Sequence, residues 1–241
     1  MACRAILVMA LVFGVLGARS TDVEPRHTTD TWIWAGISPH SPDARGTLYV
    51  FQGHIRNRGN GYAFSQEGPY PQPIPSSSSK IVLTYRLDRL VPPEALIRLF
   101  RQHRRAWERH GVVVSGLQID YDCPTARLTA YAEWLDGLNA LLSDADALSI
   151  SGLGDWLTSA PEQELRRLAR ATDFIAFMMY HNRAGLWPLE PYVRKMERLN
   201  FPFRLGLLKN QVAQEEFKLT RRAPGYRGDI VFLRRAAPHS I

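Results

Sequence analysis

The chain has 241 residues, a net charge of +7 and only two cysteines. This length fits one large domain, which buries roughly 70% of its unfolded surface and so folds without disulfides. Two cysteines exclude a disulfide-rich fold and a cysteine-rich zinc site. The densest basic group, the arginines of residues 98–109, follows one predicted helix. We expect it to be a solvated outer helix face, and we expect no nucleic-acid partner.

Residues 1–20 have the organisation of a signal peptide. Arg4 precedes an apolar run over residues 5–17, and Ala18 and Ser20 place small residues where a signal peptidase cleaves. The run is shorter than the roughly 20 residues that span a bilayer. We therefore expect a periplasmic or secreted protein, residues 21–241, with no stable membrane insertion after cleavage. Cleavage removes two arginines and no acid, which leaves a charge of +5 and Cys123 as the remaining cysteine.

Short apolar segments alternate with amphipathic segments along the rest of the chain. Strands are predicted at residues 31–35, 47–54, 80–87, 113–122, 147–153, 173–180, 203–208 and 229–233, and helices at 92–110, 125–142, 161–171 and 189–199. This order predicts a parallel sheet covered by helices, and eight strands fit a single (β/α)8 barrel domain.

The ends of this pattern are its weakest part. No helix is evident between the first two strands, and little chain follows the eighth. We therefore expect a barrel that is irregular or incomplete at its ends. The alternative is an open doubly wound sheet, which normally has a glycine-rich phosphate turn after its first strand. Residues 32–36 do not form such a turn.

The fourth predicted strand carries polar residues at alternate positions. Gln118, Asp120 and Asp122 share one face, which should point into the barrel, while residues 117, 119 and 121 are apolar or aromatic. Two carboxylates about 6–7 Å apart in a dry site raise one pKa, so one of them can act as a general acid. The strand end is also where barrel enzymes place catalytic groups. The alternative is structural: Asp122 caps the next helix and Asp120 binds a buried arginine or backbone group.

Other candidate residues have two interpretations each. Trp156, just after the fifth strand, forms either a sugar-stacking platform or a packed core side chain. Trp32 and Trp34 share a face of the first strand. They either fill the barrel interior or form the floor of a sugar-binding site. His181 and the two aspartates of the fourth strand could form a metal set. No His-x-His or His-Glu-x-x-His motif accompanies them, so we expect neither a metal nor a cofactor.

Two segments resemble a known enzyme family. Residues 116–122, Gly-Leu-Gln-Ile-Asp-Tyr-Asp, resemble the fourth-strand signature Asp-Gly-x-Asp-x-Asp-x-Glu of the chitinase-like family 18 glycoside hydrolases. Residues 173–180 resemble their sixth strand, which ends Met-x-Tyr-Asp. A closer resemblance is to a bacterial family of exported barrel proteins of unknown function, through residues 116–122 and Gly-Asp-Trp-Leu at 154–157.

The resemblance implies roles for several residues and also shows departures. Asp122 stands where the family has its acid Glu, one methylene longer, and Asp120 matches the aspartate that orients this acid. Tyr180 matches a tyrosine that holds the substrate's acetamido group. His181 replaces the aspartate that follows that tyrosine, and the predicted eighth strand lacks the family's frequent tryptophan.

The leading hypothesis is therefore a glycoside hydrolase-like protein acting on an extracytoplasmic polysaccharide or oligosaccharide. Asp122 would be the acid and Asp120 its electrostatic partner, while Gln118, Tyr180, Trp156 and His181 would contact the substrate. Whether the protein is an enzyme stays open at this point. The second hypothesis is a non-catalytic glycan-binding barrel, and the third is a metal-dependent hydrolase.

The signal-peptide prediction can be tested by mass. Expression of the full chain in a bacterial host should give extracytoplasmic protein that begins at Thr21, because Ala18 and Ser20 fit the peptidase pocket. Intact-mass spectrometry of the periplasmic fraction measures this. Uncleaved chain found in the cytoplasm would remove the prediction of export.

Overall fold

The computed structural model describes residues 29–59, 61–74, 80–181, 184–185 and 188–233. The predicted signal peptide lies outside these residues. The described strands are β1 (Thr29–Ile33), β2 (Leu48–Arg58), β3 (Gly61–Gln66), β4 (Lys80–Leu87), β5 (Val113–Asp120), β6 (Ala147–Leu153), β7 (Phe174–Met178), β8 (Tyr180–His181), β9 (Ala184–Gly185), β10 (Phe203–Leu208) and β11 (Tyr226–Phe232). The helices are α1 (Pro93–Glu108), α2 (Leu128–Asn139), α3 (Trp156–Ser159), α4 (Glu162–Arg170), α5 (Glu190–Met196) and α6 (Phe217–Thr220), with 3₁₀ turns η1 (Thr125–Arg127) and η2 (Lys209–Gln211).

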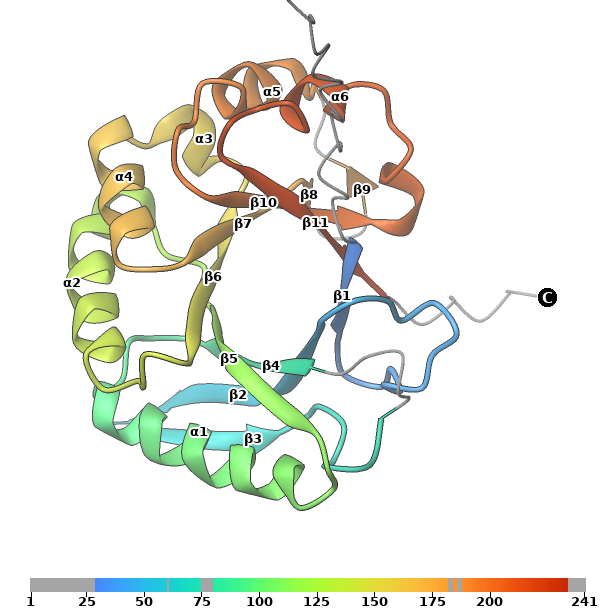
Figure 1. Cartoon of the computed structure of the whole chain (residues 1–241). Helices are drawn as coiled ribbons and strands as arrows, with labels where there is room; N and C mark the ends of the chain where they lie inside the picture. Colours follow the sequence, from blue (N-terminus) through green and yellow to red (C-terminus); the bar gives the residue numbers. More distant parts are fainter. Residues whose placement is uncertain (1–28, 60, 75–79, 182–183, 186–187, 234–241) are drawn as a thin grey trace, which may run out of the picture.

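Eight parallel strands close into a barrel. Their order is β1, β2, β4, β5, β6, β7, β10 and β11, and β11 pairs again with β1. At this closing seam Trp32 lies opposite Phe232. The helices surround the ring of strands, and the first and last strands lie side by side (Figure 1). The predicted (β/α)8 barrel is confirmed, and the open doubly wound sheet is excluded.

The barrel is irregular in its first units. No helix connects β1 to β2, as the sequence predicted, and β3 returns antiparallel to the second half of β2, from Gly53 opposite Gln66 to Arg58 opposite Gly61. This hairpin occupies the place of the next helix. Sequence periodicity missed β3 because its residues are half-buried or exposed and form no continuous apolar run. The last strand starts at Tyr226, three residues earlier than predicted, and its pairing with β1 means that the barrel is complete at its ends.

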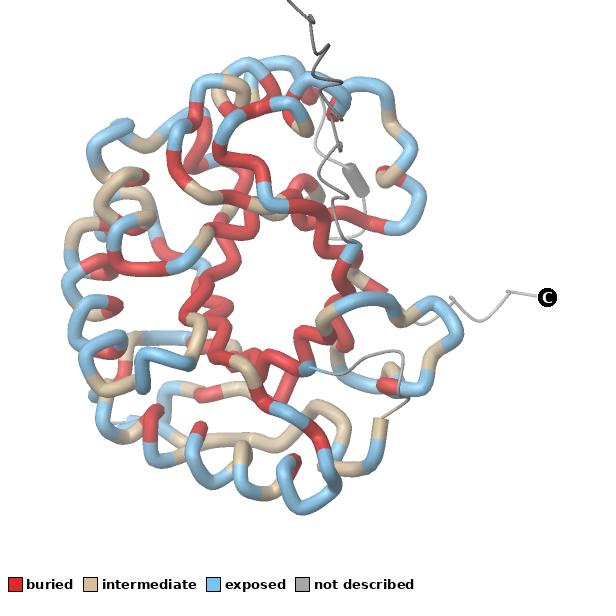
Figure 2. The backbone as a smooth tube through the Cα atoms, in the orientation of Figure 1, coloured by how far each residue is buried: buried red, intermediate tan, exposed pale blue. Residues whose placement is uncertain are grey.

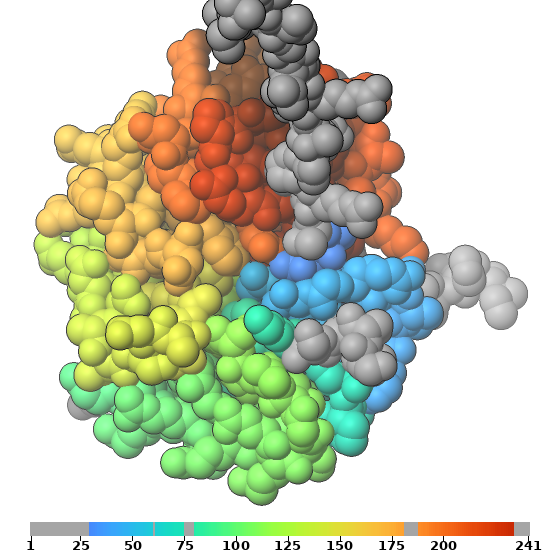
Figure 3. Space-filling view, viewed as in Figure 1, coloured from blue at the N-terminus to red at the C-terminus, as the bar shows by residue number. Residues whose placement is uncertain are grey.

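Buried residues form an inner ring of strands with exposed helix faces outside it (Figure 2). One large cluster packs the outer faces of the strands against the helices and includes Leu117 and Ile119. A second, small cluster fills the barrel itself. Its buried members are Trp32, Tyr49, Val82, Ala176 and Ile230. The space-filling view shows that side chains occupy the centre that looks open in the ribbon (Figure 3).

Trp32 is the largest side chain of the inner cluster, and its position requires a glycine on β10. A Cβ built on Gly206 would lie 2.7 Å from Cη2 and Cζ3 of Trp32 and 3.2 Å from the carbonyl oxygen of Phe177. The indole is 3% exposed, so it has little space into which it could shift. Gly206 therefore makes room for the indole of Trp32 inside the barrel.

None of the helices among the described residues is both long enough and apolar enough to cross a bilayer.

Gly206→Ala should destabilise the protein by about 1–3 kcal/mol, because overpacking a tight core forces side chains off their preferred rotamers. Gly137→Ala is the matched control. Gly137 is an exposed position within α2 whose added Cβ would meet only Pro93 Cγ, at 3.8 Å. At this helical position, replacing glycine by alanine should stabilise the protein by up to about 1 kcal/mol, because alanine has the higher helix propensity. Urea unfolding of both variants measures the two signs, and equal effects would contradict the packing role of Gly206.

Candidate functional site

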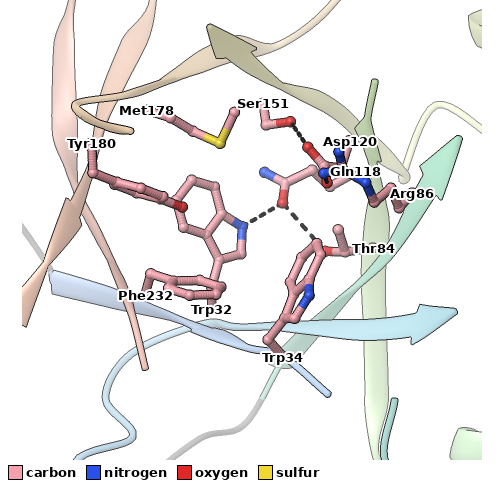
Figure 4. A pocket seen from close by; sticks show the side chains of 10 residues that line it. All are labelled: Trp32, Trp34, Thr84, Arg86, Gln118, Asp120, Ser151, Met178, Tyr180 and Phe232. Carbon is pink, nitrogen blue, oxygen red and sulfur yellow. Dashed lines mark hydrogen bonds and ion pairs between the residues drawn. The ribbon is translucent and has the colours of Figure 1, made fainter. Parts of the chain in front are cut away.

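A cavity opens at the carboxyl ends of the barrel strands, the end where barrel proteins place their functional sites. Its volume is about 170 Å³, and its lining residues are Trp32, Trp34, Thr84, Arg86, Gln118, Asp120, Ser151, Met178, Tyr180 and Phe232. Figure 4 shows two unlike sides: aromatic rings from β1, β8 and β11, and an ion pair from β4 and β5. The cavity is smaller than the roughly 300–1,000 Å³ of pockets that enclose drug-sized ligands. It therefore fits a small group or one end of a longer ligand.

Asp120 is the buried acid of the cavity. Strand register places it between Arg86 on β4 and Ser151 on β6. Arg86 Nη1 donates to Asp120 Oδ2 at 2.8 Å, and Ser151 Oγ donates to Asp120 Oδ1 at 2.5 Å. Burial raises the pKa of Asp120, while the charge of Arg86 and the serine hydrogen bond oppose this and Asp122 adds to it. The predicted rise of one carboxyl pKa in this strand is thus found at Asp120.

Arg86 is shared between two carboxylates. Its Nη2 donates to Asp122 Oδ2 at 2.5 Å while its Nη1 binds Asp120. Burial alone would lower the pKa of Arg86, but the two carboxylates raise it. A guanidinium presents its donors in a fixed fork, which suits simultaneous binding of two acceptors.

Asp122 lies outside the predicted inward row. β5 ends at Asp120, and the Asp122 side chain beyond it is 47% exposed and does not line the cavity. The expectation of three inward polar residues on one strand is therefore correct for Gln118 and Asp120 and wrong for Asp122. The strand pairing with β6 stops at Asp120, so the alternation of faces does not extend to residue 122.

Gln118 forms the floor of the cavity together with Trp32. Its Oε1 accepts hydrogen bonds from Trp32 Nε1 at 2.5 Å and from Thr84 Oγ1 at 3.2 Å. Its Nε2 donates to Ser149 Oγ at 3.4 Å. Because this buried amide is hydrogen-bonded to the neighbouring strands β4 and β6 and, across the barrel, to β1, it holds the floor rigid and fixes the indole of Trp32. Gln118 thus lies in the predicted site with a strong structural role.

Aromatic rings line the opposite side. Trp34 is half-buried and stacks on Phe51, with ring centroids 4.1 Å apart and an interplanar angle of 8°. Tyr180 stacks on Phe232 at 5.7 Å, and Trp34 meets Phe232 edge to face, also at 5.7 Å. The stacked partners hold these rings in place, so Trp34 offers a fixed surface at the cavity. Of the two interpretations of the first-strand tryptophans, Trp32 fills the barrel and Trp34 lines the opening.

Trp156 does not form the predicted platform. It is completely buried, its Nε1 donates to the carbonyl of Cys123 at 3.0 Å, and its ring meets Tyr131 of α2 edge to face. The residue starts α3, which directs its side chain between the barrel and the helices instead of into the mouth. The core-packing interpretation is correct, and Trp34, not Trp156, lines the cavity.

His181 is placed only as part of β8, and its side chain lies outside what the structure describes. Among the described residues, no group of three or more His, Cys, Asp or Glu side chains is arranged to hold a metal ion. The metal set predicted from His181, Asp120 and Asp122 includes this undescribed side chain and so lies outside the described residues.

Sequence reasoning missed Arg86 and Ser151, although the signal was available. Both lie at inward positions of buried strands, two residues after another polar residue, Thr84 and Ser149. This is the alternation that singled out Gln118 and Asp120. Comparing all the strands would have found one polar row that crosses β4, β5 and β6.

Comparisons with known proteins support the fold. Residues 80–188 match the model of a domain of unknown function (DUF3142). No curated protein sequence matches the chain. Solved structures that match include the xylanase and α-amylase inhibitor protein XAIP-II from Scadoxus multiflorus, with a TM-score of 0.56 and 13% identity over 84% of this chain and 92% of that chain. A related inhibitor, XAIP-I in complex with trehalose, matches with a TM-score of 0.55 and 13% identity over 85% and 92%.

A tamarind chitinase-like lectin also matches, with a TM-score of 0.47 and 12% identity over 78% of this chain and 84% of that chain. The two inhibitors, whose TM-scores exceed 0.5, support the barrel fold. At these identities the likeness concerns the fold.

The raised pKa of Asp120 predicts how stability depends on pH. A carboxyl whose pKa is higher in the folded state than its model value of 3.8 stabilises the fold below about pH 4, and this contribution is lost as pH rises through the folded pKa. Asp120→Asn removes the titration. The melting temperature of the wild type minus that of the variant should therefore fall as pH rises above about 4 and then level off.

Thermal unfolding between pH 3 and 8 measures this difference. Asp144→Asn, an exposed aspartate in the loop before β6, controls for the loss of one negative charge. A difference between wild type and Asp120→Asn that grows with pH would show that the Arg86 ion pair outweighs burial.

Proposed function

We propose that this protein is a carbohydrate-binding barrel that holds a sugar at the carboxyl-end cavity and does not cleave it. The observation that carries the proposal is the shared ion pair, in which Arg86 binds both carboxylates of the strand end. A general acid must carry a proton near neutral pH and reach the glycosidic oxygen. Asp120 is buried and twice hydrogen-bonded, and Asp122 lies beside the cavity in an ion pair.

The form of the cavity supports a sugar ligand. Pyranose rings present apolar C–H faces and polar hydroxyl edges, so their sites combine an aromatic surface with fixed hydrogen-bonding groups. Trp34 supplies the aromatic surface, while Arg86 and Asp120 supply a donor and an acceptor on the facing side (Figure 4). The trehalose complex of XAIP-I is a precedent for a disaccharide bound to a protein of this fold, and the proposal itself depends on the cavity.

Hydrolysis is the second candidate, and one observation favours it. Asp122 and Arg86 are partly exposed, at 47% and 37% of their side chains, and such ion pairs contribute only about 0–1 kcal/mol. Breaking this ion pair when a substrate binds therefore costs little free energy. In that case Asp122 is the acid, Asp120 its electrostatic partner, and Gln118 and Tyr180 line the substrate site. The shorter side chain of aspartate then limits the reach of the acid.

A glycan panel tests both candidates. The wild type should bind an oligosaccharide without turnover, and Trp34→Ala should weaken binding by about 1–3 kcal/mol, the value of a large apolar side chain. Tyr62→Ala is the control, because Tyr62 is 43% exposed on the β3 hairpin and does not line the cavity. Calorimetric binding and reducing-end release measure the two activities.

The variants of Asp122 separate binding from hydrolysis. For a binding protein, Asp122→Asn and Asp122→Glu should both leave product release at background. If the wild type releases product, Asp122→Asn lowers it by about 10²–10⁴-fold and Asp122→Glu preserves it, then hydrolysis replaces our proposal. If no glycan binds to the wild type at all, the carbohydrate function is wrong.

A further inference from the structure

The carbohydrate cavity also combines negative charge with aromatic rings. We propose that its ligand is an amino sugar with a free, protonated amine, so that an ammonium group lies between Asp120 and the aromatic side of the cavity. This inference rests on the proposed carbohydrate function and adds the charge class of the sugar.

The charges at the cavity do not balance. Arg86 is the one cation among the described lining residues, and it binds both Asp120 and Asp122. One guanidinium neutralises one carboxylate, so this group of three side chains keeps one net negative charge when both acids are ionised. The whole chain has the opposite sign, with a net charge of +7. The ion-paired group is therefore locally negative on a basic protein, with Arg86 and Asp120 lining the cavity and Asp122 beside it.

Asp120 keeps hydrogen-bonding capacity toward the cavity. An ionised carboxylate offers about four acceptor sites on its two oxygens. Arg86 uses one site on Oδ2 and Ser151 one on Oδ1. An ammonium group supplies only donors. It can donate to a remaining acceptor site of Asp120 and at the same time neutralise the excess negative charge of the ion-paired group. An acetamido group at the same place supplies one neutral N–H donor and a carbonyl oxygen that would face the carboxylate.

The aromatic side favours the same ligand. A cation within about 6 Å of an aromatic ring centroid is attracted by the ring quadrupole, and this attraction strengthens where water is excluded. Trp34 and Tyr180 line the same cavity as Asp120, and both are held by stacking, on Phe51 and Phe232 respectively. Figure 4 shows Tyr180 across the space from the ion pair, and Trp34 at the lower edge of the space near Thr84. A ring of one amino sugar can thus stack on Trp34 while its amine faces the acid.

The experiment compares two oligosaccharides of equal length, one built of glucosamine and one of N-acetylglucosamine, by calorimetry on the wild-type protein. The glucosamine oligomer should bind at least about tenfold more tightly. Asp120→Asn should reduce its affinity by about 10- to 100-fold, the size expected for a charge-assisted hydrogen bond, and should reduce the preference between the two oligomers. Asp144→Asn removes one acid at the other end of the barrel and should leave both affinities unchanged.

Three outcomes would overturn the inference. If the acetylated oligomer binds equally well or more tightly, and this binding still depends on Trp34, the proposed carbohydrate function stands and the proposed free amine is wrong. If Asp120→Asn and Asp144→Asn weaken binding of the glucosamine oligomer equally, the preference for glucosamine comes from the net charge of the protein and not from the cavity. Failure of either oligomer to bind removes the proposed function together with the inference. Should Asp120→Asn fail to fold, the wild-type comparison decides by itself, with added tetramethylammonium expected to compete with the glucosamine oligomer.

Discussion

The barrel depends on filling its own interior at the seam where the chain closes on itself. Eight strands leave an interior just wide enough for side chains, and a gap there would forfeit packing contacts on every strand. Trp32 on the first strand packs inside the barrel in one cluster with Ile230 of the last strand, and Gly206 on β10 makes room for it. The indole N–H cannot remain buried without an acceptor. Gln118 supplies this acceptor, so the packing of the seam also fixes the floor of the cavity.

The polar side chains above this floor, on β4, β5 and β6, are placed by the register of these strands. Residues at matching register positions of adjacent strands point to the same face of the sheet, and we call such a row a layer. Thr84, Gln118 and Ser149 form one layer, and Arg86, Asp120 and Ser151 form the next. The lower layer is fully buried and internally bonded, whereas Arg86 in the upper layer is partly exposed. The change from a fully buried layer to one that lines the open side of the cavity therefore occurs over two residues along β4, β5 and β6.

The departures from a hydrolase are also physical in origin. A free general acid needs a carboxyl that is protonated at working pH and directed at the ligand. Asp120 has the raised pKa, but it lies in the barrel wall under Arg86 and Ser151. Asp122 has the exposure, but it lies past the end of β5. The raised pKa and the exposure thus belong to two different residues, and Arg86 binds both, which is why we propose binding and not cleavage.

The sequence by itself determined the architecture and half of the site. Apolar strands alternating with amphipathic helices require a parallel sheet, because each buried strand has to be covered on both faces, and β4, β6 and β10 were located to the residue. Period-two alternation also placed Gln118 and Asp120 inside. Tertiary structure decided the rest. The direction of Trp156 depends on how the chain turns after β6, and the position of Asp122 depends on where pairing of β5 ends. The bridging of two acids by Arg86 depends on strand register, a relation between distant segments that no local pattern encodes.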